Sequence, residues 1–215
     1  MNAERLTRWA IVLLALPLLS LQAQDLQMKG RSSIEFTLGL WGGSKVSNTI
    51  TEGTHYEAAV SAFAGGIIYG RWLQENLSFT LSSGILAGRA SSTVRFTSVD
   101  QQASMVVPIL LGLRYYLPEP SPDAAVRPYL CGALGPYIGF EANNSTLSQD
   151  AHSEIAFGGR LGAGLDIIAA EHVKFGANAG YNLVSDFATP IGQRLNLSGA
   201  DFSIGIGYLF GDAHP

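Results

Sequence analysis

Apolar residues recur at every second position in several stretches of this chain, most regularly near its two ends. The stretch Ser33–Trp41 places four apolar side chains on one face, and Gly199–Phe210 places five on one face. A period of two is typical of a β-strand with one apolar side. No stretch after the first 23 residues shows an apolar period of 3.6, so we predict no helix in that part of the chain.

The same alternation predicts eight strands. We expect them at Ser33–Trp41, within Glu57–Leu73, within Leu77–Ala87, and at Ala103–Leu117, Val126–Phe140, Ser153–Ile168, Val173–Leu183 and Gly199–Phe210. The predicted connections alternate in length. Three are short or rigid: Gln74–Asn76, Pro118–Ala125 and Ala169–His172. Four are long and polar: Gly42–Tyr56, Gly88–Gln102, Glu141–His152 and Val184–Ser198. Short turns at one end and long loops at the other are typical of transmembrane β-barrels.

The first 23 residues have the pattern of an export signal. Arg5 and Arg8 precede the apolar stretch Trp9–Leu21, and Leu21-Gln22-Ala23 is a suitable cleavage site. We therefore predict a cleaved signal peptide at residues 1–23 and one domain at residues 24–215. The signal contains no cysteine, so we do not expect a lipid-anchored lipoprotein.

Composition narrows the class of membrane protein. A spanning helix needs about 18–20 apolar residues, whereas the longest later apolar run, Met105–Leu113, has nine residues and includes a proline. If the chain spans a membrane, it must do so as a closed sheet. The net charge is −4, and it becomes −5 without the signal, which carries Glu4, Arg5 and Arg8. This mild acidity argues against a nucleic-acid partner.

Several segments resemble a known family. Val107–Tyr116 is similar to the fourth strand of small OmpA/OmpW-like outer-membrane β-barrel proteins, and Arg127–Tyr129 with Gly132–Tyr137 is similar to the strand that follows. Gly162–Asp166 and the closing Gly205–Phe210 fit the same pattern. The resemblance implies an all-β fold, an eight-stranded antiparallel up-and-down barrel in the bacterial outer membrane with both termini in the periplasm. It is poorly specific for activity, because such barrels serve as anchors, adhesins, channels and lipid-modifying enzymes.

Charged side chains on barrel strands are expected to face the lumen. On this rule we predict a lumenal network of seven residues: Glu35, Arg71, Arg114, Arg127, Arg160, Asp166 and Asp201. The strand predicted within Glu57–Leu73 fits this rule worst, because placing Arg71 in the lumen also places Phe63, Ile67 and Tyr69 there. An eight-stranded interior is just wide enough for side chains to fill, so these charges are expected to pair and close the lumen.

The sequence offers one catalytic lead, in His152-Ser153-Glu154. Some barrels that resemble this chain deacylate lipid A with Ser, His and Glu. A triad needs its base within reach of the hydroxyl, but adjacent strand residues point to opposite faces. We therefore predict no enzyme activity and no catalytic residues. No histidine spacing fits a metal site, and no cofactor is expected.

These observations favour a barrel with a structural or surface-interaction role and a salt-bridged, plugged interior. The alternative is a narrow channel for small solutes, and a lipid-modifying barrel enzyme ranks third. The expected partners are outer-membrane lipid, the barrel-assembly machinery during insertion, and an extracellular partner contacted through the long loops.

Overall fold

The computed structural model describes residues 27–42, 63–95, 98–118, 125–144, 149–192 and 194–212, so the predicted signal segment lies outside the described residues. Eight β-strands make up most of this part of the chain. They are β1 (Ser32–Trp41), β2 (Phe63–Gln74), β3 (Leu77–Arg95), β4 (Ser98–Tyr116), β5 (Val126–Asn144), β6 (Gln149–Ala170), β7 (Val173–Val184) and β8 (Gly199–Phe210). No helix among the described residues is long and apolar enough to cross a membrane.

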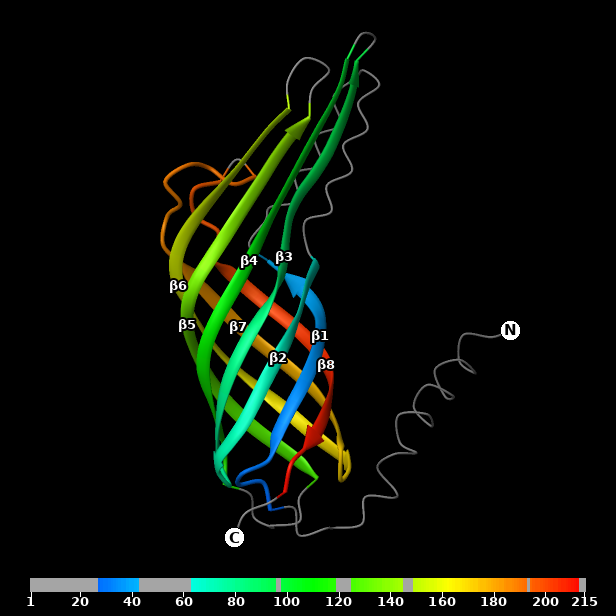
Figure 1. The fold of residues 1–215 in the computed structure, drawn as a ribbon, viewed down its shortest axis with the longest axis vertical. Helices are drawn as coiled ribbons and strands as arrows, with labels where there is room; N and C mark the ends of the chain where they lie inside the picture. The colour runs from blue at the N-terminus through cyan, green and yellow to red at the C-terminus, as the bar shows by residue number, and fades with distance from the viewer. Residues whose placement is uncertain are drawn as a thin grey trace, which may run out of the picture.

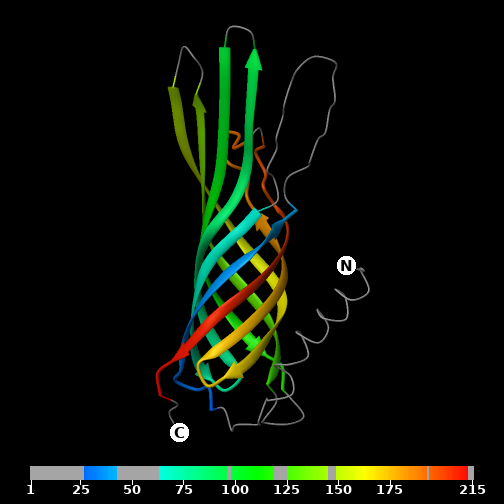
Figure 2. The ribbon, with the colours of Figure 1, turned by 90° about the vertical axis from the view of Figure 1, so that its right-hand side faces the viewer.

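The eight strands close into one barrel (Figures 1 and 2). Each strand pairs antiparallel with the next, and β1 pairs with β8. From Ser32 on β1, the paired residues can be followed from strand to strand around the wall, through Leu113 on β4 and Leu161 on β6, to Ala200 on β8. The carbonyl of Ala200 accepts a hydrogen bond of 2.7 Å from the N–H of Gly42, the residue after β1. The register therefore advances by ten residues on β1, from Ser32 to Gly42. Such a stagger requires strands tilted by about 35–45° to the barrel axis.

Alternation along the strands sorts the side chains as predicted for the two ends of the chain. The outward residues of β1 run from Ile34 to Leu40 at every second position and are 39–60% exposed. The outward residues Phe202, Ile204, Ile206 and Tyr208 of β8 are 51–59% exposed. Because these exposed side chains are apolar, the outer wall is suited to lipid rather than to water.

The hairpins β3–β4 and β5–β6 extend well beyond the other strands (Figures 1 and 2). The sequence predicted loops at Gly88–Gln102 and Glu141–His152, but strand pairing continues there to Arg95↔Ser98 and Asn144↔Gln149. The loop predictions were wrong because backbone hydrogen bonds maintain pairing where no apolar alternation marks it. The predicted loop Gly42–Tyr56 lies almost wholly outside the described residues.

The two mouths of the barrel differ. One mouth, here called the turn end, carries the short connections β2–β3 and β6–β7 and the end of β8 (Figure 1). The opposite mouth, the loop end, carries the extended hairpins and the β7–β8 connection. A buried apolar cluster fills each mouth, and polar side chains occupy the space between the clusters. The loop-end cluster includes Trp41, Val106, Tyr137, Phe187 and Ile191. The turn-end cluster comprises Met28, Trp72, Tyr116, Tyr129, Ile168 and Leu209.

Candidate functional site

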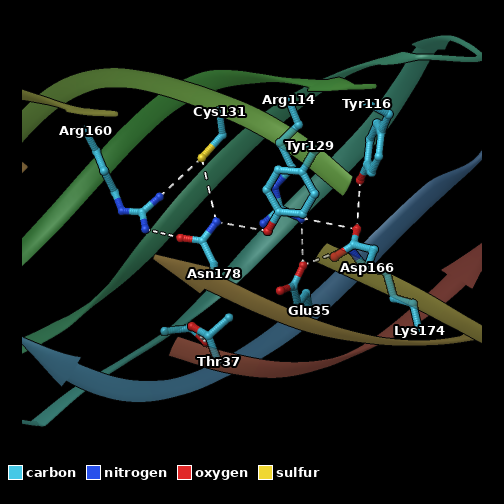
Figure 3. A network of polar contacts seen from close by, with 11 residues as sticks. Glu35, Thr37, Arg114, Tyr116, Tyr129, Cys131, Arg160, Asp166, Lys174 and Asn178 are labelled. Carbon is cyan, nitrogen blue, oxygen red and sulfur yellow. Dashed lines mark hydrogen bonds and ion pairs between the residues drawn. The ribbon is translucent and has the colours of Figure 1, made fainter. Parts of the chain in front are cut away.

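Four charged side chains meet inside the barrel near the turn-end cluster, and we call them the quartet: Glu35, Arg114, Asp166 and Lys174 (Figure 3). Arg114 Nη1 lies 3.0 Å from Glu35 Oε2 and 3.7 Å from Asp166 Oδ2. Lys174 Nζ lies 2.8 Å from Glu35 Oε2 and 3.1 Å from Asp166 Oδ2. Each cation therefore contacts both anions, and the quartet has no net charge.

The quartet unites four strands because each member faces the lumen from a different one: β1, β4, β6 and β7. Lys174 reaches Glu35 across β8, where Gly207 pairs with both residues. A side chain at Gly207 would collide with Lys174, since an added Cβ would lie 2.8 Å from Lys174 Cε. The absence of a side chain at Gly207 thus opens the path for this ion pair.

Aromatic rings surround the quartet. The Tyr116 hydroxyl donates a hydrogen bond of 2.8 Å to Asp166 Oδ2. The Arg114 guanidinium lies 4.8 Å from the centre of the Tyr129 ring, and Lys174 Nζ lies 5.7 Å from that of Trp72. All four charged residues are at most 5% exposed. Removing one partner would leave an uncompensated charge in a medium of low dielectric constant, whereas every charge of the intact set has a partner of opposite sign.

A second ion pair lies nearer the loop end. Arg160 Nε lies 3.0 Å from Asp201 Oδ2, and the same oxygen accepts a hydrogen bond of 2.7 Å from Asn182. Arg160 also donates to Asn178 and, at 3.5 Å, to the sulfur of Cys131. Asn178 in turn donates to the Tyr129 hydroxyl at 3.0 Å (Figure 3). A continuous polar network therefore runs from the second pair to the ring against which Arg114 packs.

The β7–β8 connection folds into the loop-end mouth, and its described residues 185–192 and 194–198 form a lid. Its side chains Phe187 and Ile191 are 2% and 1% exposed within the loop-end cluster. Gly139 on β5 leaves room for them, since an added Cβ there would lie 2.7 Å from Ile191 Cγ1. Gly192, at φ +58°, donates its N–H to Glu141 Oε2 at 2.9 Å. The lid is thus held by both apolar packing and hydrogen bonds.

A cavity of about 120 Å³ separates the quartet from the loop-end cluster. Glu35 and Arg114 bound it on one side, while Leu86 and Leu110 bound it on the other. Small side chains such as Ser82 and Ser203 leave this space open. Charged side chains such as Glu35 and Arg160 line it together with apolar ones, so the described part of the lumen keeps a small chamber between the quartet and the loop-end cluster.

The structure places six of the seven predicted residues on the lumenal side, but in separate groups. Glu35, Arg114 and Asp166 belong to the quartet, whereas Arg160 and Asp201 form the second pair. Arg127 lies apart, at the turn-end mouth. Its guanidinium stacks 5.1 Å from the Tyr116 ring centre, and its Nη2 donates to Glu75 O at 2.8 Å. The predicted network included Arg127, but in the described part of the chain this residue contacts Tyr116 and the Glu75 carbonyl rather than a carboxylate.

The predicted lumenal position of Arg71 is wrong, because the structure places this residue on the outer face of β2. Arg71 is exposed, while Trp72 beside it is 3% exposed and faces the lumen. Phe63 and Ile67 consequently face outward, at 45% and 49% exposure. The charge-inside rule failed because Arg71 lies close to the β2–β3 turn, from which a long side chain reaches the membrane–water interface.

This placement predicts a small effect of substitution. Arg71→Ala should change the free energy of unfolding by no more than about 0.5 kcal/mol, as is typical of an exposed residue. Urea unfolding of the refolded protein measures the change, with Arg114→Ala as the comparison. A loss as large as that of Arg114→Ala would show that Arg71 lies inside the barrel.

Lys174 is the site residue that the sequence analysis missed. The signal was present, because the outward positions of β7 are apolar from Val173 to Leu183, while Lys174 alternates with them beside Gly176 and Asn178. The rule that predicted Arg114 would also have selected Lys174.

The sequence His152-Ser153-Glu154 lies in the extended part of β6. His152 and Ser153 are consecutive strand residues and therefore point to opposite faces. Glu154 Oε1 accepts a hydrogen bond of 2.9 Å from Thr189 Oγ1 in the lid. In this geometry Glu154 contributes to holding the lid, and the three residues do not converge on one point.

A closed antiparallel barrel with an apolar outer wall and a paired, polar lumen defines the class of outer-membrane β-barrels. The profile of the family described as outer membrane protein beta-barrel domain matches residues 11–210. The chain belongs to this family, and membership supports a location in the outer membrane.

Solved structures with the same fold come from several bacteria. The attachment invasion locus protein Ail of Yersinia pestis has a TM-score of 0.52 and 16% identity, over 85% of this chain and 100% of that chain. Neisserial surface protein A has a TM-score of 0.52 and 14% identity, over 85% and 98%. Outer membrane protein W of E. coli has a TM-score of 0.50 and 13% identity, over 85% and 98%. A search among curated proteins finds no match.

Proposed function

We propose that this protein is a closed outer-membrane barrel with a structural or surface-interaction role, carried by the extended hairpins at its loop end. The observation that carries this proposal is the occupied lumen: the lid, the second ion pair and the quartet follow one another along the barrel. A lumen filled in this way leaves the outer wall and the projecting hairpins as the surfaces available to partners.

The asymmetry of the two mouths supports an orientation. Transmembrane barrels have short periplasmic turns and longer extracellular segments, and here the hairpins β3–β4 and β5–β6 project from one mouth only (Figure 2). The turn end then lies in the periplasm, and we infer the same location for both termini. Outer-membrane lipid covers the apolar wall, the barrel-assembly machinery inserts the chain, and an extracellular partner contacts the hairpins. Among similar folds, one protein is named for attachment and invasion.

Conductance tests the closed lumen. The refolded protein in a planar bilayer should show no steady open current, because two ion-paired layers and an apolar lid block the path. A heat-modifiability gel on the same sample verifies that the barrel is folded. A steady current through the folded wild-type protein would contradict the closed-barrel proposal.

Attachment tests the surface role. Cells that display a variant with β3–β4 and β5–β6 shortened to tight turns should bind less to a target surface than cells that display the full barrel. The shortening keeps Glu141 and Glu154, which accept hydrogen bonds from the lid. The lumen and lid therefore remain in this variant, and equal folded amounts in the two membranes make the comparison valid. Equal attachment to every surface tested would argue against the hairpins as the interacting element.

A second candidate, a narrow channel for small solutes, is favoured by one feature of the wall. Near the cavity, the β3–β4 ladder skips from Ser83↔Ile109 to Leu86↔Val106, and the β4–β5 ladder also skips beyond Pro108. Pro108 has no N–H to donate to the ladder, so the wall is less strongly bonded beside the chamber. Solute-driven swelling of proteoliposomes, with no ionic current, would support this alternative.

A further inference from the structure

The segment that precedes β1 covers the turn-end mouth. Met28 is 0% exposed and packs in the turn-end cluster with Trp72, Tyr116 and Leu209. Methionine is flexible and its thioether packs well against aromatic rings. The Trp72 ring that helps to bury Met28 also lies 5.7 Å from Lys174 Nζ. Met28 therefore lies in the cluster directly adjoining the quartet.

One carboxylate holds this segment in place. Glu75, in the turn between β2 and β3, accepts a hydrogen bond of 2.8 Å from Met28 N on one oxygen and one of 3.0 Å from Lys29 N on the other. Hydrogen bonds from backbone N–H groups to an ionised carboxylate are stronger than neutral ones. Glu75 directly follows β2, the strand that pairs with β1, so its two bonds hold the segment against the β2–β3 turn.

The chain direction reverses at Gly30, which allows Met28 to enter the mouth. Gly30 has φ +86°, a conformation that favours glycine. Its N–H donates to Trp72 O at 3.0 Å, and Trp72 N donates to Arg31 O at 2.9 Å. Arg31 also donates to the backbone carbonyl of Glu171 on the β6–β7 turn. The segment is thus anchored at Arg31 beside β1 and held at Met28 by Glu75.

We propose that residues 27–31 form a stopper of the turn-end mouth, with Met28 as the plug and Glu75 as its latch. Release of the latch lets Met28 leave the mouth while the strands stay paired, so that water reaches the quartet from this side. The anchor at Gly30 and Arg31 limits the movement to the residues before it. The stopper acts at the mouth opposite the lid, and it is independent of any partner of the hairpins.

Thiol labelling tests the stopper directly. In the full-length mature protein, Cys131→Ser removes the native thiol and Met28→Cys places one thiol at the plug. A membrane-impermeant methanethiosulfonate then reports how often this position opens, because the labelling rate follows the open population when reclosing is fast. Adding Glu75→Gln should raise the rate by about tenfold, since hydrogen bonds to a charged group are lost.

Glu171→Gln is the matched control. Glu171 contacts Arg31 through its backbone carbonyl, so this substitution removes an acidic charge at the same mouth without removing the latch and should leave the labelling rate unchanged. A heat-modifiability gel verifies the fold of each variant. Rapid labelling before any latch substitution would overturn the stopper, and equal labelling rates with and without Glu75→Gln would overturn the latch.

A second measurement tests the plug with Glu75 left in place, so it does not require that the Glu75→Gln variant folds. With Trp41→Phe, Trp72 is the sole tryptophan after residue 23, and its fluorescence reports on the turn-end cluster. Adding Met28→Ala should increase quenching of Trp72 by acrylamide, because the plug is lost while Glu75 remains. Unchanged quenching would overturn the assignment of Met28 as the plug.

Discussion

Asp166→Ala is expected to lower the free energy of unfolding of the barrel by about 3–5 kcal/mol, the range typical of breaking a buried ion pair. Asp166 is 1% exposed and contacts Lys174 at 3.1 Å, Arg114 at 3.7 Å and the Tyr116 hydroxyl at 2.8 Å. Its loss leaves the quartet with a net positive charge inside the wall. Urea unfolding of the protein refolded in lipid vesicles measures the change.

Two variants make this prediction specific. Asp212→Ala removes an exposed acid beyond β8 and should alter the free energy of unfolding by no more than about 0.5 kcal/mol. Asp166→Asn combined with Lys174→Gln makes the quartet neutral again, so this double variant should be more stable than Asp166→Asn alone. Equal losses for Asp166→Ala and Asp212→Ala would mean that Asp166 is solvated.

Phe187→Ala is expected to loosen the lid by about 3–5 kcal/mol, as for the removal of a buried phenylalanine side chain. Phe187 is 2% exposed in the loop-end cluster. Because the lid is one connection between β7 and β8, its release exposes the lid residues without separating the strands. Limited proteolysis should then cut the lid much faster than in the parent protein, while the uncut barrel keeps the heat-modifiable gel mobility of the parent.

Leu195→Ala is the matched control, since Leu195 belongs to the same connection but is 47% exposed. Its removal should leave the cutting rate nearly unchanged. If both substitutions accelerate cutting equally, the packing of Phe187 does not hold the lid. If neither does, the hydrogen bonds of Gly192 and Thr189 are sufficient to hold it.

Asp166→Ala and Phe187→Ala should differ in how much of the structure they destabilise. The quartet joins four strands that are distant in the sequence, so losing Asp166 weakens the whole barrel. The lid packs on the mouth from a single connection, so losing Phe187 affects a local opening. Comparing unfolding with proteolysis for both variants separates these two closures of the lumen.

The sequence determined the faces of most strands. With Arg114 predicted in the lumen, alternation places Ile109, Leu111 and Leu113 of β4 on the outer face, and these residues are 39%, 56% and 48% exposed. It also predicted the bounds of β8 as Gly199–Phe210. This works because a side chain on a strand has only two faces, and lipid on one of them selects apolar residues. The same logic applies to Lys174, which the prediction omitted.

Alternation was insufficient to assign the two faces of a strand where both faces carry similar residues. On β2 the lumenal positions include Gly66 and Gly70, which have no polar side chain. The single charge of Arg71 therefore decided the prediction, and the inner and outer faces of β2 were assigned the wrong way round. In the hairpins beyond the barrel, polar residues pair through their backbones and leave no periodic signal. Whether an arginine near a turn faces outward, and whether a polar segment continues as a strand, depends on the height of these residues along the barrel axis. The sequence of one strand alone does not reveal this height.

The partners of each charge were decided only by the tertiary structure. Alternation placed Arg114 and Arg160 on lumenal faces, but the ten-residue stagger sets the height at which each reaches the lumen. Arg114 consequently meets Glu35 and Asp166, while Arg160 meets Asp201. The lid and the stopper were likewise invisible in the pattern, because a connection enters a mouth only after eight paired strands have formed that mouth and left space within it.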